Sequence, residues 1–334
     1  MKIMPALIAI LLLLLAVYAG VELMGLHLLF GGVLPYAAVL VFIGGFIYAI
    51  LRWAKVPVPF SIPTTCGQQR SLSWIKPNRI DNPQTKTAVV VRMALEVLTF
   101  RSLFRNTETR VANGAVTHAA TKWLWAASLA FHWCFLIVLF RHLRFFSEPI
   151  PAVVSGVAAL DGFLQVGLPT VYVTGVILLL SVTFLFLRRI YLPQMRHMSL
   201  PADYFPLFLI LGIVITGLLI RHIVRTDVSG VKEFALGLVS FHPVAAATAA
   251  EGIHWLFFVH LSFVSVLLIY FPFSKLMHMG GVFLSPTRNL PANSRAVRHI
   301  NPWNHPVPVH SYEEYEEEFG DKMKAAGIPL DKAD

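Results

Sequence analysis

The chain has 334 residues, of which 56% are hydrophobic and only 13% are charged. Because soluble domains carry about 25% charged residues, this composition excludes an ordinary soluble domain and indicates a membrane protein. Its two cysteines, Cys66 and Cys134, are too few for a disulfide framework or a cysteine-ligated iron–sulfur cluster. Any iron–sulfur chemistry is therefore expected in a partner.

Six apolar stretches are each close to the roughly 20 residues that a helix needs to cross a bilayer core. They predict an all-α fold, a polytopic membrane helix bundle of about six transmembrane helices. The stretches cover approximately residues 5–22, 29–51, 120–144, 163–187, 203–224 and 250–277. The first resembles a secretory signal peptide, and we expect it to be retained as a signal anchor. An even number of spans places both termini on one side of the membrane.

Basic residues set the expected orientation, because cytoplasmic loops of membrane proteins are rich in Lys and Arg. They gather in residues 52–117 and in the turn 188–202, whereas the opposing loops 21–28 and 146–162 contain none. We therefore expect an inner-membrane protein surrounded by lipid, with its N and C termini in the cytoplasm. The formal charge of +9 then follows from topology and requires no nucleic acid partner.

The cytoplasmic segment 52–117 contains two kinds of sequence. The stretch around Thr64–Gly67 is Pro-rich and long for a connector, and we expect it to contact a redox partner. Residues 87–107 have apolar positions at helical spacing, which predicts an amphipathic helix on the inner membrane surface or under a partner subunit.

The polar tail after His278 contains an acidic run at residues 313–318. This tail is expected to be extended over a partner or merely flexible.

Four histidines lie in or at the end of the apolar stretches: His132 and His142 in the third, His260 in the sixth and His278 at its end. An ionisable group in hydrocarbon is costly and usually functional, and neutral imidazole is the usual protein ligand of haem iron. By helical rise the first two lie about 15 Å apart and the second two about 27 Å, less if Pro272 kinks the helix. The two spans run in opposite directions. Depth alone therefore pairs His132 with His278 toward the cytoplasm and His142 with His260 toward the outside, as two bis-histidine haems would require.

A single buried histidine in a membrane helix is more often a hydrogen-bonded structural group or a proton-handling group than a metal ligand. The prediction of haem therefore depends on two pairs at complementary depth. The remaining histidines lie at membrane edges or in polar segments, and among them His254 and His222 are the better further candidates. A proton-relay transporter would usually contain an internal repeat, and the sequence shows none.

The His132-x9-His142 helix, the His260-x17-His278 spacing and the PFSKLMH ending resemble the gamma subunit of respiratory nitrate reductase over roughly residues 118–280. The stretch PVPFSIPTTCGQQRSLSWIKP resembles the cytochrome b subunit of the DsrMKJOP membrane complex associated with dissimilatory sulfite reductase, the DsrM type, and its Hme relatives. The resemblance implies a nitrate reductase gamma-like core with two b haems on the four histidines. An extra first span and the long loop depart from the nitrate reductase pattern, so quinone-site residues are not carried over.

The resemblance also implies a function and partners. It implies a di-haem cytochrome b subunit that transfers electrons between menaquinone or menaquinol and a cytoplasmic iron–sulfur subunit related to heterodisulfide reductase, in dissimilatory sulfate or sulfite metabolism. A periplasmic multihaem cytochrome c, a periplasmic iron–sulfur protein and a second integral membrane subunit complete the implied complex. The expected organisation is two N-terminal transmembrane helices in 1–51, the Pro-rich loop and amphipathic helix in 52–117, the four-helix di-haem core in 118–280, and a cytoplasmic tail in 281–334.

Polar residues near the expected outer haem are candidates for a quinone or propionate site. Arg141 or Arg144 is placed to hold a haem propionate or a quinone carbonyl, and Asp161, with Gln165 nearby, to relay protons. Snorkelling at a helix end explains the same arginines. For Arg221 and Arg225 at the end of the fifth span, the alternatives are contact with haem propionates or the same snorkelling. Two other functions stay open: a quinol-oxidising gamma subunit of a nitrate reductase-like enzyme, and a haem-free membrane anchor or proton-relay protein.

Overall fold

Long apolar helices account for most of the protein. The structure, a computed structural model, describes residues 2–56, 78–112, 115–167, 169–249, 252–285, 288–292 and 308–331. The Pro-rich stretch around Thr64–Gly67, for which the sequence predicts a partner contact, lies outside these described residues.

Six helices are long and apolar enough to cross a membrane, which confirms the predicted polytopic all-α fold. They cover Met4–Leu23, Leu29–Ala54, Lys122–Phe145, Val173–Tyr191, Pro201–Val224 and Trp255–Phe273. The fourth begins at Val173 rather than at residue 163, because the chain before it turns through left-handed backbone at Gln165 and Gly167. The protein is thus a multi-pass membrane protein.

Each span consists of one long α-helix, and some continue into a short turn of different pitch. The long helices are α1 (Met4–Tyr18), α2 (Leu34–Ala54), α5 (Lys122–His142), α7 (Val173–Tyr191), α9 (Pro201–Leu219) and α12 (Trp255–Tyr270). The π-helical turns are η1 (Ala19–Leu23), η2 (Leu29–Val33) and η4 (Ile220–Val224), and a 3-10 turn, η3 (Leu143–Phe145), follows α5.

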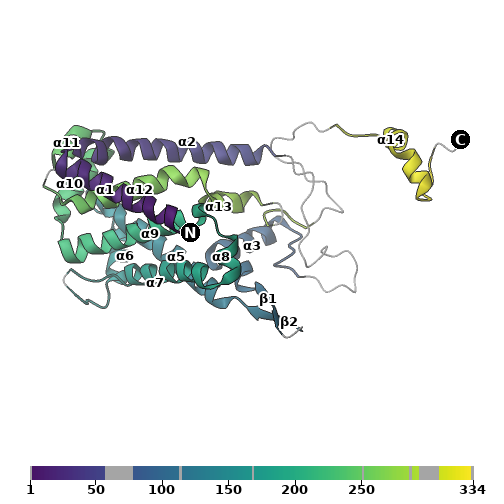
Figure 1. Ribbon diagram of the computed structural model, residues 1–334, viewed down its shortest axis with the longest axis horizontal. Helices are drawn as coiled ribbons and strands as arrows, with labels where there is room; N and C mark the ends of the chain where they lie inside the picture. The colour runs from purple at the N-terminus through teal and green to yellow at the C-terminus, as the bar shows by residue number, and fades with distance from the viewer. Residues whose placement is uncertain are drawn as a thin grey trace.

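Four of these helices form a core, and the first two lie beside it. α5 packs on α7, α7 on α9, and α9 on α12, whereas α1 contacts α9 and α12, and α2 runs along α12 (Figure 1). The N-terminal pair therefore covers faces of α9 and α12 away from α5. Any group held between α5 and α12 lies on the opposite side of α12 from this pair.

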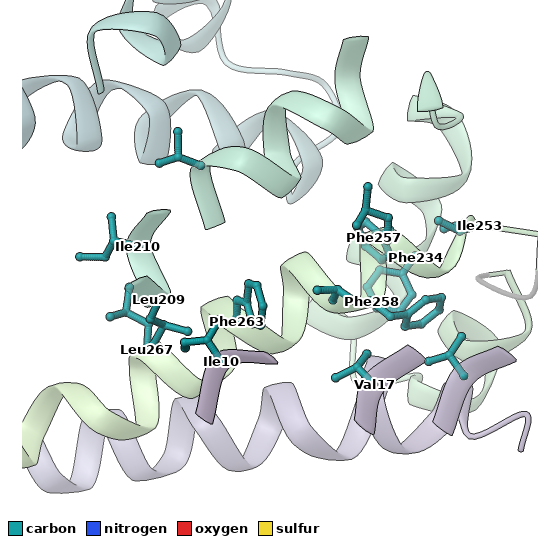
Figure 2. Packing of buried hydrophobic residues seen from close by; sticks show 14 of the residues in the cluster. Ile10, Val17, Leu209, Ile210, Phe234, Ile253, Phe257, Phe258, Phe263 and Leu267 are labelled. Carbon is teal, nitrogen blue, oxygen red and sulfur yellow. The ribbon is translucent and has the colours of Figure 1, made fainter. Parts of the chain in front are cut away.

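The core is packed around α12, whose Phe258 and Phe263 are fully buried. In Figure 2 Phe263 lies near Ile10 of α1 and Leu209 of α9. Phe258 lies further along α12, near Val17 of α1 and beside Phe234. Because lipid tails are as apolar as these side chains, the contacts stabilise the bundle through close packing rather than transfer out of water. This packing fixes α12, and with it His260, relative to its neighbours.

The α-helix of the sixth span ends at Tyr270, two residues before Pro272, which confirms the predicted interruption. Pro lacks the N–H that a continuing helix needs, and the chain passes through η5 (Phe271–Phe273) to extended backbone at Ser274. The Ser274 hydroxyl accepts the N–H of Leu276 and starts η6 (Lys275–Met277), followed by α13 (His278–Gly281) and η7 (Val282–Leu284). His278 is thereby placed on a separate short helix rather than on the helix of His260.

The predicted amphipathic segment is α3 (Lys86–Thr99) followed by α4 (Arg101–Phe104). The last carbonyls of α3 accept indole N–H groups of α5, from Trp125 at Thr99 and from Trp133 at Leu98. These bonds hold the end of α3 against α5. An antiparallel hairpin, β1 (Thr107–Ala112) and β2 (Ala115–Ala120), then leads into α5; the sequence analysis did not predict it.

Shorter helices complete the described chain. They are α6 (Ala152–Asp161), α8 (Pro193–Met198), α10 (Val228–Val239), α11 (Pro243–Ala249) and α14 (Tyr312–Ala325). Within the described part of the tail, α14 is a helix where extended or flexible chain was expected. Ser311 and Glu314 form a capping box at its start, with Lys322 and Lys324 in its last turn, so helix formation is favoured at both ends.

Candidate functional site

Two pairs of histidines face each other, with α5 on one side and α12 and α13 on the other. The ring centres of His132 and His278 lie 6.0 Å apart, and those of His142 and His260 lie 6.4 Å apart. The first pair lies at the end of the bundle that carries α3, and the second at the end that carries α10. These are the same pairings that depth predicts from the sequence.

Each of the four imidazoles uses its Nδ1 in a hydrogen bond. His132 bonds the carbonyl of Ser128 and His142 that of Val138, both at 2.7 Å, and His278 bonds the carbonyl of Lys275 at 2.8 Å. His260 bonds the hydroxyl of Thr216 at 3.0 Å.

A carbonyl only accepts, so the three nitrogens bonded to carbonyls carry the proton. The Nε2 of those rings then keeps its lone pair. Metal-bound histidines have this arrangement, in which the second ring nitrogen donates to a carbonyl and fixes the tautomer.

The geometry of the pairs fits haem better than a metal bound by protein alone. A metal–imidazole bond is about 2 Å, so two axial imidazoles on one metal have ring centres about 6 Å apart, as observed in both pairs. Among the described residues no group of three His, Cys, Asp or Glu side chains is placed to hold a metal ion. Two protein ligands suffice only when a macrocycle supplies the rest, as the haem porphyrin does.

Aromatic rings surround the His132–His278 pair. Phe100 and Phe131 each meet the His132 ring edge-to-face at 4.9 Å. Phe100 ends α3 in left-handed backbone, with φ of 50°, an unfavourable conformation for a large side chain. The two tryptophan bonds at the end of α3 hold this corner in place. The α3–α4 corner therefore contributes directly to the surroundings of His132.

A buried charge cluster lies beside the His142–His260 pair. The Arg141 guanidinium pairs with Asp161 at 3.0 Å, and Asp161 also accepts the N–H and hydroxyl of Thr174 at 2.8 and 2.6 Å. The ring of Tyr172 lies 3.7 Å from the guanidinium carbon of Arg141 and 4.4 Å from that of Arg221. Two cations thus flank Tyr172 next to the second histidine pair, and Asp161 pairs with one of them, Arg141.

Comparison with known proteins identifies the family. The family model of the nitrate reductase gamma subunit matches residues 89–298. The chain belongs to this family. The matched range holds all four paired histidines, whereas α1 and α2 precede it.

Individual relatives agree with this assignment. The chain is 44% identical over 279 residues to the Hdr-like menaquinol oxidoreductase cytochrome b-like subunit of Archaeoglobus fulgidus, with 83% of each chain covered. It is 42% identical over 275 residues to the subunit of the same name from Archaeoglobus profundus, with 81% of each covered. The chain is 28% identical over 114 residues to the respiratory nitrate reductase 1 gamma chain of Escherichia coli, with 33% of this chain and 50% of that one covered.

The other predicted residues of this nitrate reductase gamma family member have contacts of their own. His254 caps α12, since its Nδ1 accepts the N–H of Leu256 at 3.2 Å. Gln165 is exposed, and the Arg144 guanidinium carbon lies 5.9 Å from the Phe145 ring. His222 follows Arg221 in η4, and its Nε2 is buried without a hydrogen-bond partner among the described residues.

Three residues of the site were not found by sequence analysis. Thr216 and Tyr172 act across helices, and Phe100 depends on the path of the chain after α3. The adjacent Thr216 and Gly217 offered a signal, because a polar and a small residue together in an apolar span commonly mark a helix contact. No such signal distinguished Phe100 or Tyr172.

Proposed function

We propose that this chain is the membrane-embedded di-haem cytochrome b subunit of a respiratory redox complex. The observation that carries the proposal is the two histidine pairs, with His132 and His278 proposed to hold one haem and His142 and His260 the other. Family membership and the cytochrome b-like relatives support a membrane redox subunit. A haem with two histidine ligands has no open iron position, so it supplies one-electron transfer and does not bind substrate at the metal.

The proposed electron donor or acceptor in the membrane is menaquinone. The names of the Archaeoglobus relatives describe Hdr-like menaquinol oxidoreductases, which supports a quinone partner and a cytoplasmic iron–sulfur subunit related to heterodisulfide reductase. We further propose the DsrMKJOP type of complex, with a periplasmic multihaem cytochrome c, a periplasmic iron–sulfur protein, a second membrane subunit and a link to sulfite metabolism. The motif around Cys66 supports this assignment.

The charge cluster is proposed to bind an anionic or carbonyl group beside the outer haem. Asp161 neutralises one of the two guanidinium groups that flank Tyr172, so one positive charge remains without a counter-charge in the cluster. A haem propionate or a quinone oxygen is a ligand of the right charge or polarity for Arg141 and Arg221. Because Asp161 already accepts from Thr174 and pairs with Arg141, its contribution is to orient Arg141, and proton release would require these contacts to open.

The cytoplasmic side is proposed to be the end that carries α3. The charge pattern supports this orientation, since Arg188 and Arg189 end α7 at that side. The proposed organisation keeps the N-terminal helix pair in 1–51, the cytoplasmic segment in 52–117, the di-haem core in 118–280 and the tail in 281–334. With this orientation His132 and His278 lie nearest the iron–sulfur partner.

The test is a reduced-minus-oxidised visible spectrum of the purified chain, with a haem count per polypeptide. Two b-type haems per chain are expected. One haem per chain would remove the di-haem assignment, and a colourless protein would favour a membrane anchor or a proton-relay protein. A rate of menaquinol oxidation by the assembled complex would then test the partner assignment.

A further inference from the structure

His260 differs from the other three paired histidines in the group that its Nδ1 contacts. The others bond backbone carbonyls of their own segments at 2.7, 2.7 and 2.8 Å. His260 on α12 instead contacts the side chain of Thr216 on α9, at 3.0 Å. One of the four imidazoles is thus oriented by a side chain of a neighbouring helix.

The direction of this hydrogen bond is fixed by the second contact of the hydroxyl. Thr216 Oγ1 lies 2.6 Å from the carbonyl oxygen of Gly212, which can only accept, so the hydroxyl proton is donated there. Its oxygen is then left to accept from Nδ1–H of His260. Thr216 is 5% exposed, and a buried hydroxyl engaged in this way is restricted to one orientation.

The residue after Thr216 makes the close approach of the two helices possible. A Cβ at Gly217 would lie 3.2 Å from Cε1 of His260, closer than ordinary van der Waals contact. The glycine therefore leaves space for the imidazole, and the threonine supplies its acceptor. Both come from one turn of α9.

We propose that Thr216 is a positioning residue for the outer haem, one that holds the His260 ring and makes it a stronger electron donor. This inference rests on the proposed di-haem function. A hydrogen bond from the second nitrogen of a ligating imidazole raises its basicity. A more basic ligand favours the oxidised, more positive iron, so removal of the acceptor should raise the reduction potential of the outer haem.

The experiment compares Thr216→Val with Thr216→Ser in the full-length chain. Valine keeps the shape and removes the acceptor, whereas serine restores the hydroxyl. Ser265→Ala is the matched control, because Ser265 is also buried in α12 and bonds the Leu261 carbonyl of its own helix at 2.8 Å. Each variant is measured by redox titration of both haems and by electron paramagnetic resonance of the oxidised protein.

For Thr216→Val we expect the equilibrium constant for reduction of the outer haem to rise by up to about tenfold, or about 59 mV for one electron. The low-spin resonance of that haem should shift, because the His260 ring is free to rotate. Thr216→Ser and Ser265→Ala should match the wild type, and the inner haem should be unchanged in all variants. Loss of the outer haem in Thr216→Val with its retention in Thr216→Ser would also support the positioning role.

Three results would overturn the inference. An unchanged potential and resonance in Thr216→Val would mean that another group, such as the nearby Ile213 carbonyl, orients His260. An equal shift in Ser265→Ala would mean that the effect comes from packing. In both cases haem in the wild type would leave the proposed function intact, whereas a wild-type chain without haem would overturn the inference and the proposed function together.

Discussion

At the scale of residues, the contacts of Nδ1 separate the proposed haem ligands from the structural histidines. In the four paired histidines Nδ1 is engaged and Nε2 is left with the lone pair. In His254 the Nδ1 itself accepts a backbone N–H and caps a helix. Sequence shows only that these side chains lie in apolar surroundings, and the structure shows which nitrogen each has left for a ligand.

Ligand pairing can be tested by single substitutions. His132→Ala or His278→Ala should remove the inner haem, and His142→Ala or His260→Ala the outer one, because each haem needs both of its axial ligands. Haem content and low-temperature spectra of the purified variants provide the measurement. His254→Ala is the control and should retain both haems. If His132→Ala and His142→Ala removed the same haem, the proposed pairing would be wrong.

The buried ion pair beside the outer site should be important for stability. Asp161→Asn leaves the Arg141 guanidinium without its counter-charge. The side chains of Asp161 and Arg141 are only 3% and 10% exposed. Breaking such a pair typically costs about 3–5 kcal/mol, and denaturant titration in mild detergent would measure it. Glu148→Gln removes the exposed partner of Lys232 and should cost about 1 kcal/mol or less. Equal effects of the two substitutions would contradict the assigned role of the buried pair.

At the scale of elements, α3 is amphipathic in an unusual sense. Its buried residues include Arg92 and Glu96, whereas Val90, Val91 and Leu98 are at least half exposed. Its polar face is therefore covered by the protein and its apolar face is open. A helix of this kind is expected to lie in the membrane interface with the apolar face in lipid.

Spin labels placed on α3 would test its depth. A label at Val90 or Val97 of the purified chain in a bilayer should be more accessible to oxygen, which concentrates in lipid, than to a water-soluble nickel complex. A label at Lys86, at the start of the helix, should show the opposite preference. Preferential access of nickel at Val97 would instead indicate a water-exposed face, one that a partner subunit covers in the complex.

The elements differ in how far sequence alone determines them. The six spans and the break at Pro272 follow from local composition and are confirmed. α6 was missed because it lies in the predicted loop 146–162 and is too short to register as a span, and the late start of α7 was missed because residues 163–172 are also mostly apolar although they turn at Gln165 and Gly167. The capping box Ser311–Glu314 was present in the tail and its helix could have been predicted. The role of Thr216 could not have been predicted, because it depends on which helix packs against α9.

At the scale of the whole molecule, the two histidine pairs define a path between the two ends of the bundle. His132 and His142 are separated by about 15 Å along α5. The outer pair lies beside the Arg141 and Arg221 cluster, and the inner pair lies beside the α3–α4 corner. Quinol oxidation at the outer end would release protons outside while electrons pass inward. Such a separation of protons and electrons would store about 2.3 kcal/mol per charge for each 100 mV of membrane potential.

The side at which quinol reacts follows from the order in which the haems are reduced. A quinol analogue added to the wild type should reduce both haems. In His142→Ala, which lacks the outer haem, the inner haem should stay oxidised on the same timescale, because no electron reaches it from the proposed quinone site. In His132→Ala the outer haem should still be reduced at the wild-type rate, so the two variants are controls for each other. Rapid reduction of the inner haem in His142→Ala would place the quinone site on the cytoplasmic side and remove the charge separation, since protons and electrons would then leave on the same side.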